Sequence, residues 1–428
     1  MSDVKRETRN VKRDLPLAED VGRGTGNGLQ PGPANGQSPM ANCASPADQD
    51  LPLAGDGGRE TGDDLRADRP PRRFGLAQVL AGLLLLAFCA QGFWLLLRTP
   101  LGEAELDFSQ GAEIRGGFLS PAVASPVTAL AAHAASVGVH EPWACRLPFL
   151  LVGILLGASV WYIARRLYGN HGGYVALTLY AFSPSMVTSS ARVQPEIIAA
   201  WGIFGCIFTA IAVAHTLYAP RHVIRWNWKR IALLGLALGV GAGAQVSALV
   251  ALVFGLAFML YLAPERRGIA MALGAASLAI GLAVFAALHG FRWSELLAST
   301  RDTGGFTLRM LVAPAVWRML GVLLLHNSPG FVLLLALSLV TLVVWRRARF
   351  FGNLAPLLTA TALIGFGWIF PHAAGFTFLV AALPFLFVFT AGVCADLLES
   401  RQAPLASGMI SAALVMHAYF SVSGLWRL

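Results

Sequence analysis

The run "IALLGLALGVGAGAQVSALVALVFGLAFMLYL", from Ile231 to Leu262, decides how many times this chain can cross a membrane. It is much longer than the ~20 apolar residues that a spanning helix needs, and basic residues stand at both ends. Lys and Arg mark cytoplasmic loops, so both ends lie on one side, and an unbroken helix cannot return there. Its middle, "GVGAGAQVS" (Gly239–Ser247), is rich in glycine. We expect two short helices turning at Gly241–Gln245 near the outer face; the alternative is one long tilted helix.

The composition of the whole chain indicates a membrane protein. The chain has 428 residues, 56% of them hydrophobic and 13% charged, and its mean hydropathy is +0.62. A soluble domain rarely departs so far from average usage. The net charge of +9 therefore marks cytoplasmic loops and not a nucleic-acid surface. The five cysteines show no metal-ligand or disulfide spacing, so we expect no metal site and no cofactor.

Hydropathy and basic loops predict an all-α polytopic membrane protein whose N-terminus is cytoplasmic. The predicted spans are eleven, at about 76–97, 146–164, 172–190, 196–218, 231–243, 245–262, 269–289, 329–345, 353–370, 375–396 and 404–423. This order puts every basic loop on the cytoplasmic side. Residues 1–75 are rich in Gly, Pro, Asp and Arg and almost free of aromatic residues, so we expect a disordered cytoplasmic tail ahead of a membrane domain at 76–428.

The first outer loop, residues 98–145, is acidic and far longer than a plain connection. We expect a short helix from Glu103 to Arg115, ended by two glycines, with Glu103 and Asp107 on one face and Glu105 pointing elsewhere. On that basis Glu105 should tolerate replacement by Gln. A second helix, Pro126–Val137, is expected to lie in the membrane interface with Ser125 as its N-cap.

Carboxylates gathered at a low-dielectric boundary raise one another's pKa, so one of them can act as a general base near neutral pH. Glu103 is the first candidate for this base and Asp107 the second. The alternative is that all of them stay ionised and solvated, without chemistry.

Several stretches occur in an order typical of one family. They are "WACRLPFLLVGILLG" (Trp143–Gly157), "ARRLYGNHGGYVAL" (Ala164–Leu177), "YAFSPSMVTSSARVQPEIIAAWG" (Tyr180–Gly202), "LGLALGVGAGAQVSALV" (Leu234–Val250) and "AAGFTFLVAALPFLFVFTAG" (Ala373–Gly392). With the acidic loop, they resemble the GT-C glycosyltransferases, specifically family 39-like proteins related to protein O-mannosyltransferases and bacterial aminoarabinose transferases. The resemblance implies a polyprenyl-phosphate sugar donor, a lipid, glycan or protein acceptor, and transfer on the outer or lumenal face without an obligatory metal.

The chain departs from the family pattern at several places. The family commonly has adjacent Asp and Glu in the first outer loop, whereas here Glu103 falls nearest the family's Glu and follows Gly102. Gln245 stands where relatives often carry Lys at the break between the two short helices, and Phe376, Thr377 and Phe378 stand where relatives usually carry Arg and Tyr. These differences keep open a catalytically silent member of the fold.

Further polar residues in the predicted outer segments are candidates for binding the substrate. Arg192 and Glu196 flank a short turn and either bind sugar or phosphate or form a helix-end ion pair. Guanidinium groups bind phosphate bidentately, which favours a donor-binding role in the second large outer loop, 290–328. The full set of predicted substrate-binding residues is Glu105, Arg192, Glu196, Gln245, Arg292, Arg301 and His372.

Three functions fit these features. The first is a glycosyltransferase in a cell membrane, most simply the bacterial inner membrane. The second is a silent scaffold on the same fold. The third is a transporter, against which stand the absence of repeated halves and the position of nearly all charges near helix ends.

Overall fold

The computed structural model describes residues 75–102, 105, 114–115, 118–119, 125–136, 141, 143–218, 228–291, 312–348, 350–370 and 377–425. These residues belong to one unit, Asp63–Leu428. The predicted tail, apart from Gly75, lies outside the described residues.

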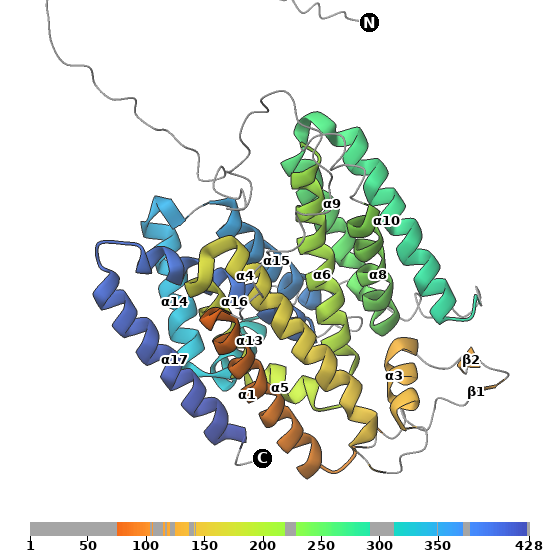
Figure 1. The fold of residues 1–428 in the computed structure, drawn as a ribbon, viewed down its shortest axis with the longest axis horizontal. Helices are drawn as coiled ribbons and strands as arrows, with labels where there is room; N and C mark the ends of the chain where they lie inside the picture. The colour runs from red at the N-terminus through yellow and green to blue at the C-terminus, as the bar shows by residue number, and fades with distance from the viewer. Residues whose placement is uncertain are drawn as a thin grey trace, which may run out of the picture. The chain divides into compact units, whose positions relative to one another are not determined.

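The described residues are almost entirely helical, which confirms the all-α fold (Figure 1). The longer helices are α1 (Leu76–Arg98), α3 (Pro126–Ser136), α4 (Leu147–Ala181), α5 (Pro184–Ser190), α6 (Pro195–Thr216), α8 (Trp228–Ala244), α9 (Val250–Leu262), α10 (Arg267–Leu288), α13 (Pro314–Asn327), α14 (Pro329–Val344), α15 (Phe351–Ile369), α16 (Thr377–Leu398) and α17 (Ala403–Leu425). Single 3₁₀ turns are η4 (Ala144–Arg146), η5 (Val246–Leu249), η6 (Pro264–Arg266) and η7 (Arg346–Ala348). Two short strands, β1 (Ile114–Arg115) and β2 (Phe118–Leu119), pair antiparallel.

Helix α4 holds the predicted span 146–164 and the first part of 172–190, which α5 completes, because the chain reverses within α4 at Gly169. This glycine has φ 73°, which L residues rarely adopt, and its two sides pack against each other. The Tyr180 hydroxyl donates to the Gly153 carbonyl at 2.6 Å, and Gly173 faces Arg165. Residues 147–168 and 170–190 therefore run antiparallel, as the predicted spans 146–164 and 172–190 require.

The run from Ile231 to Leu262 is broken, as its glycines and its flanking charges predicted. Helix α8 ends at Ala244, Gln245 is extended with φ −151° and ψ 115°, and η5 and α9 follow. Gly241 on α8 and Gly255 on α9 both contact α6, at Gly202 and Ala210 respectively. These contacts show that α8 and α9 form a hairpin against α6, and the single tilted helix is excluded.

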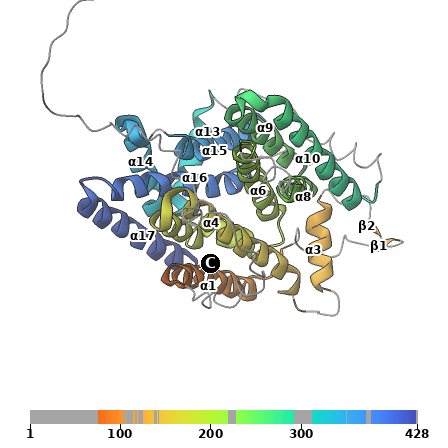
Figure 2. The same ribbon diagram turned by 45° about the horizontal axis from the view of Figure 1, so that its top comes forward.

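Small residues let α8 approach its neighbours closely. Gly235, Gly239 and Gly243 recur every fourth residue and face α10, while Gly241 on another face meets Gly202 of α6. A Cβ added at Gly202 would lie 2.6 Å from the Gly241 Cα, so the two backbones are almost in contact. Lipid tails are as apolar as the side chains, so the hydrophobic effect does not drive helices together in a membrane. Close van der Waals packing of small residues stabilises their association instead. Figures 1 and 2 both show α6, α8, α9 and α10 as neighbours.

Each of the eleven predicted spans corresponds to a helical segment of the described residues. Seven helices there are long and apolar enough to cross a membrane, one of them being α4 with its reversal, and Val246–Leu262 and Pro329–Val344 are shorter apolar helices. The remaining segment is α8. One helix was not predicted: α13 lies in the second large outer loop, where Trp317 packs on Trp368 of α15 with ring centroids 4.5 Å apart.

The helices alternate in direction, so the structure has two ends. The end that we call the "loop end" holds Arg98, Arg146, the turn 191–195 and Gln245. Hydrogen bonds of Arg146, Glu105 and Ser125 connect the helices there. The "basic end" holds the reversal of α4 and the turns after α6, α9, α14 and α16, where Tyr168 donates to the Gly352 carbonyl at 2.6 Å and Asn353 donates to Asp396 at 3.0 Å. The predicted cytoplasmic pairs Arg165/Arg166 and Arg266/Arg267, together with Lys229, Arg346 and Arg401, all lie at the basic end.

Candidate active site

The acidic first loop is fixed to the loop end by one buried ion pair. Glu105 is 7% exposed and Arg146 is 1% exposed. Arg146 Nη2 lies 2.5 Å from Glu105 Oε2, and Arg146 Nε donates to Glu105 Oε1 at 2.9 Å. Two backbone N–H groups complete the contacts, from Gly102 to Oε2 at 3.0 Å and from Val193 to Oε1 at 2.8 Å. Both carboxylate oxygens are therefore occupied by protein donors.

The other side of the Arg146 guanidinium caps α1. Its Nη1 donates to the carbonyls of Leu96 at 3.3 Å and Thr99 at 2.7 Å and to the Thr99 hydroxyl at 3.0 Å, while Nη2 donates to the Pro100 carbonyl at 2.9 Å. Carbonyls at a helix C-terminus have no partner within the helix. One buried side chain thus satisfies them and joins α1, α4 and the loop, an arrangement that we call the "Arg146 clamp".

The Arg146 clamp keeps Glu105 ionised. Burial by itself raises the pKa of the Glu105 carboxyl, but the hydrogen bonds from Arg146, Gly102 and Val193 and the arginine's charge outweigh burial and hold the pKa below its ordinary value. A carboxylate in this state neither gives up its charge nor turns toward a substrate near neutral pH. The expectation that Glu105 tolerates Gln stays a prediction about activity, but the burial and pairing of this side chain lead us to expect that the same replacement destabilises the fold.

The turn between α5 and α6 lies directly against the Arg146 clamp through the Val193 N–H. Arg192 is exposed, and Glu196 is half-buried in the first turn of α6. No salt bridge joins Arg192 to Glu196, so the helix-end ion pair considered above is not formed. Glu196 Oε2 is buried and has no hydrogen-bond partner among the described residues. Glu105, Arg192 and Glu196 are thus brought to one region of the loop end.

Helix α3 joins the loop end at the break between α8 and α9 (Figure 1). The Ser125 hydroxyl donates to the Ala244 carbonyl at 2.5 Å and lies 2.7 Å from the Thr128 hydroxyl oxygen. The predicted helix is confirmed, but the Ser125 hydroxyl bonds to α8 and to the Thr128 side chain, and not to a backbone N–H as an N-cap would. Thr128 is fully buried whereas Leu130 is 43% exposed, and Val127 lies against Gly243 of α8. Gln245 follows Ala244 directly and is half-buried.

The segment that ends the acidic stretch differs from the prediction. Ile114 pairs with Leu119 and Arg115 with Phe118, so the chain reverses between β1 and β2 and no helix reaches Arg115. The physical reason is the Gly-Gly pair at 116–117, which two-residue hairpin turns favour at least as strongly as helix ends do.

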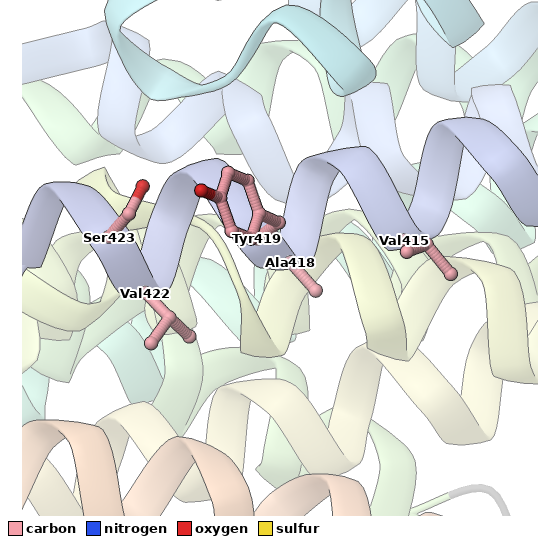
Figure 3. A pocket seen from close by; sticks show the side chains of 5 residues that line it. All are labelled: Val415, Ala418, Tyr419, Val422 and Ser423. Atoms are coloured by element: carbon pink, nitrogen blue, oxygen red, sulfur yellow. The ribbon is translucent and has the colours of Figure 1, made fainter.

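Several predicted site residues lie outside the described residues, namely Glu103, Asp107, Arg292, Arg301 and His372. Among the described residues, no group of three or more His, Cys, Asp or Glu side chains is placed to hold a metal ion. A shallow apolar pocket of about 530 Å³ lies on α17, lined by Val415, Ala418, Tyr419, Val422 and Ser423 (Figure 3). It offers only two hydroxyl groups and none of the charged residues discussed above.

Sequence reasoning missed Arg146, the most buried charged side chain in the described part of the chain. The signal was present in the sequence. An arginine that directly precedes a long apolar segment is costly to bury unless a carboxylate or carbonyl group pairs with it. What the sequence did not show is which carboxylate that partner is.

The comparisons with known proteins agree with this architecture. Residues 124–289 match the model of the dolichyl-phosphate-mannose-protein mannosyltransferase family. The fold is similar to that of the oligosaccharyltransferase of Archaeoglobus fulgidus in its apo form, with a TM-score of 0.55, 10% identity, and coverage of 82% of this chain and 56% of that one. A search of curated sequences gave no match.

Two further solved structures share the fold. ArnT from Cupriavidus metallidurans in the apo state has a TM-score of 0.50 and 18% identity, over 78% of this chain and 61% of that one. The archaeal oligosaccharyltransferase AglB, in complex with an inhibitory peptide and a dolichol-phosphate, has a TM-score of 0.54 and 11% identity over 82% and 56%. This chain thus spans little more than half the length of these proteins. It shares the fold of these solved structures, and its residues 124–289 match the mannosyltransferase family model named above.

Proposed function

We propose that this protein is a membrane glycosyltransferase that moves a sugar from a polyprenyl-phosphate donor to a lipid, glycan or protein acceptor on the outer face of a cell membrane. The observation that carries the proposal is the Arg146 clamp. It ties Glu105, which stands between Glu103 and Asp107 in the sequence, to the turn 191–195 that carries Arg192 and leads to Glu196. The family match over residues 124–289 covers Arg146 and this turn.

In this proposal the reaction is an inverting displacement at the anomeric carbon. The acceptor hydroxyl oxygen forms a bond to that carbon while the bond to the donor phosphate oxygen breaks, and the lipid phosphate leaves with the electron pair. Glu103, or secondly Asp107, takes the proton of the acceptor hydroxyl. We assign Arg192, Arg292, Arg301 and His372 to binding the donor phosphate, whose growing charge guanidinium groups stabilise. Glu196 and Gln245 accept and donate hydrogen bonds to the sugar.

Glu105 serves the same site indirectly. Its two oxygens already receive N–H groups from Arg146, Gly102 and Val193. It therefore positions the residues on either side and does not itself remove a proton.

A silent scaffold of the same fold is the second candidate, and one observation favours it. Gly102 occupies the position before Glu103, so the adjacent Asp-Glu pair that the resemblance leads one to expect is absent. A bacterial inner membrane suits either function.

The test compares cells lacking the protein with cells that produce the wild type, Glu103→Gln, Asp107→Asn or Glu141→Gln at equal levels. Glu141 is an exposed carboxylate in the same loop and serves as the matched control. Mass spectrometry of surface glycans and glycolipids should show one sugar modification that requires the wild type and survives Glu141→Gln. Loss of the base should lower its rate by about 10²–10⁴. An identical glycan profile with and without the protein would favour the scaffold.

A further inference from the structure

The basic end carries three contacts between an arginine and an aromatic side chain, two with the guanidinium over the ring and one with a tyrosine hydroxyl. The Arg165 guanidinium lies 5.1 Å from the Trp161 ring centroid, and Arg266 lies 5.6 Å from that of Tyr218. Arg166 Nη1 lies 3.5 Å from the Tyr162 hydroxyl oxygen. The rings of Tyr162 and Tyr218 are 55% and 46% exposed, and that of Trp161 is half-buried. The pairs come from α4, α6 and η6, elements that the sequence separates widely.

The pairing fixes the depth of the three guanidinium groups. Side chains on a helix point toward its N-terminus, so Arg165 and Arg166 lie back along α4 over residues one turn earlier. The Arg266 side chain lies against the turn that follows α6, where it packs over Tyr218 and donates to the Leu217 carbonyl. All three groups are therefore held beside apolar helix surface, at the level of interfacial aromatic side chains, and do not extend freely into water.

The surrounding charge is also positive. Among the described residues of this end, the exposed basic ones are Lys229, Arg230, Arg267, Arg346 and Arg401, and the acidic ones are the exposed Glu265 and Glu399 and the half-buried Asp396. Trp228, at 62% exposure, lies next to Lys229 and adds another interfacial aromatic side chain. An anion that binds here must accept guanidinium hydrogen bonds while its other part lies against an apolar surface. A phospholipid with a negatively charged headgroup has both properties.

We propose that the basic end binds anionic phospholipid headgroups, with Arg165, Arg166 and Arg266 as the groups that contact the phosphodiester. The guanidinium fork matches two phosphate oxygens; the ring beneath Arg165 and Arg266 and the Tyr162 hydroxyl beside Arg166 hold the three forks in place. This binding is separate from the proposed transfer of sugar at the loop end and would persist in a catalytically silent protein.

The experiment uses the full chain in a zwitterionic detergent and measures binding of phosphatidylglycerol and phosphatidylcholine with the same acyl chains by native mass spectrometry. Each basic residue near an anionic lipid is worth on the order of fivefold in affinity. The wild type should thus prefer phosphatidylglycerol on the order of a hundredfold. Arg165→Gln/Arg166→Gln/Arg266→Gln should remove most of that preference.

Two controls keep the result decisive. Arg98→Gln removes an arginine that lies 4.8 Å over Trp94 at the loop end, and the preference should stay. Should the loss of Arg266 unfold the protein, Arg165→Gln/Arg166→Gln leaves the contact with Leu217 intact and should still lower the preference on the order of 25-fold. Equal binding of both lipids by the wild type would overturn the proposal, as would a triple variant that keeps the wild-type preference. Inorganic phosphate that displaces phosphatidylglycerol at equal concentration would instead indicate a site for soluble anions and would overturn it as well.

Discussion

At the scale of single residues, Arg146 and Glu105 connect the chemistry of the loop to the stability of the fold. Glu105→Gln leaves the size of the side chain unchanged but removes its charge, and its amide nitrogen would face N–H donors from Arg146, Gly102 or Val193. Removing one partner of a buried ion pair costs about 3–5 kcal/mol, because the other charge stays buried. We expect a clear fall in the thermal unfolding temperature of the purified protein.

Glu141→Gln is the matched control for this prediction. The residue is an exposed carboxylate in the same loop, and such surface changes usually stay within about 0.5 kcal/mol. Equal unfolding temperatures for the two variants would show that the Arg146 clamp does not stabilise the fold.

The same carboxylate predicts how stability depends on pH. Its pKa is lower in the folded than in the unfolded protein, so the unfolded state binds more protons between the two values. The contribution of Glu105 is therefore complete above its ordinary pKa and is lost as the pH falls through the lowered one. Unfolding temperatures of the wild type and Glu105→Gln, measured from neutral to acidic pH, should converge below that range. A constant difference at all pH values would contradict the assignment.

At the scale of elements, the glycines of α6 and α8 set how closely these helices pack. An alanine at Gly202 would place its Cβ 2.6 Å from the Gly241 Cα and 2.8 Å from the Ala237 carbonyl oxygen, and neither backbone atom can move independently. Overpacking of this kind costs about 1–3 kcal/mol. Gly202→Ala should lower the unfolding temperature, and it should weaken proposed activity only if the loop end shifts.

Gly408→Ala provides the comparison within a helix. A Cβ at this position in α17 meets nothing within 4 Å, and Ala is favoured over Gly in a helix by about 1 kcal/mol. We expect unchanged or slightly higher stability. A Gly202→Ala variant as stable as Gly408→Ala would show that α6 and α8 are not held at backbone contact.

At the scale of the whole molecule, the alternation of helices predicts opposite sides for the two ends. A reporter inserted at the turn 263–266 should lie in the cytoplasm, and one fused after Leu428 should lie outside, since α17 runs from the basic end to the loop end. Paired reporters, one active only inside and one only outside, provide the measurement. A cytoplasmic signal after Leu428 would contradict the eleven-span order.

The class of protein, the eleven helical segments and the break at Gln245 could be predicted from the chain alone, because hydropathy, glycine content and flanking charge are properties of short stretches of sequence. The sequence also grouped the basic loops that the structure places at one end. Only the tertiary structure decided that Arg146 pairs with Glu105, 41 positions away, and that Val193 completes the clamp from 88 positions away. It likewise decided that β1 and β2 form a hairpin where a helix end suited Gly116-Gly117 equally well. The physical reason is that several acids stood near the membrane boundary, and the choice of partner depends on which donors the packed helices bring within about 3 Å.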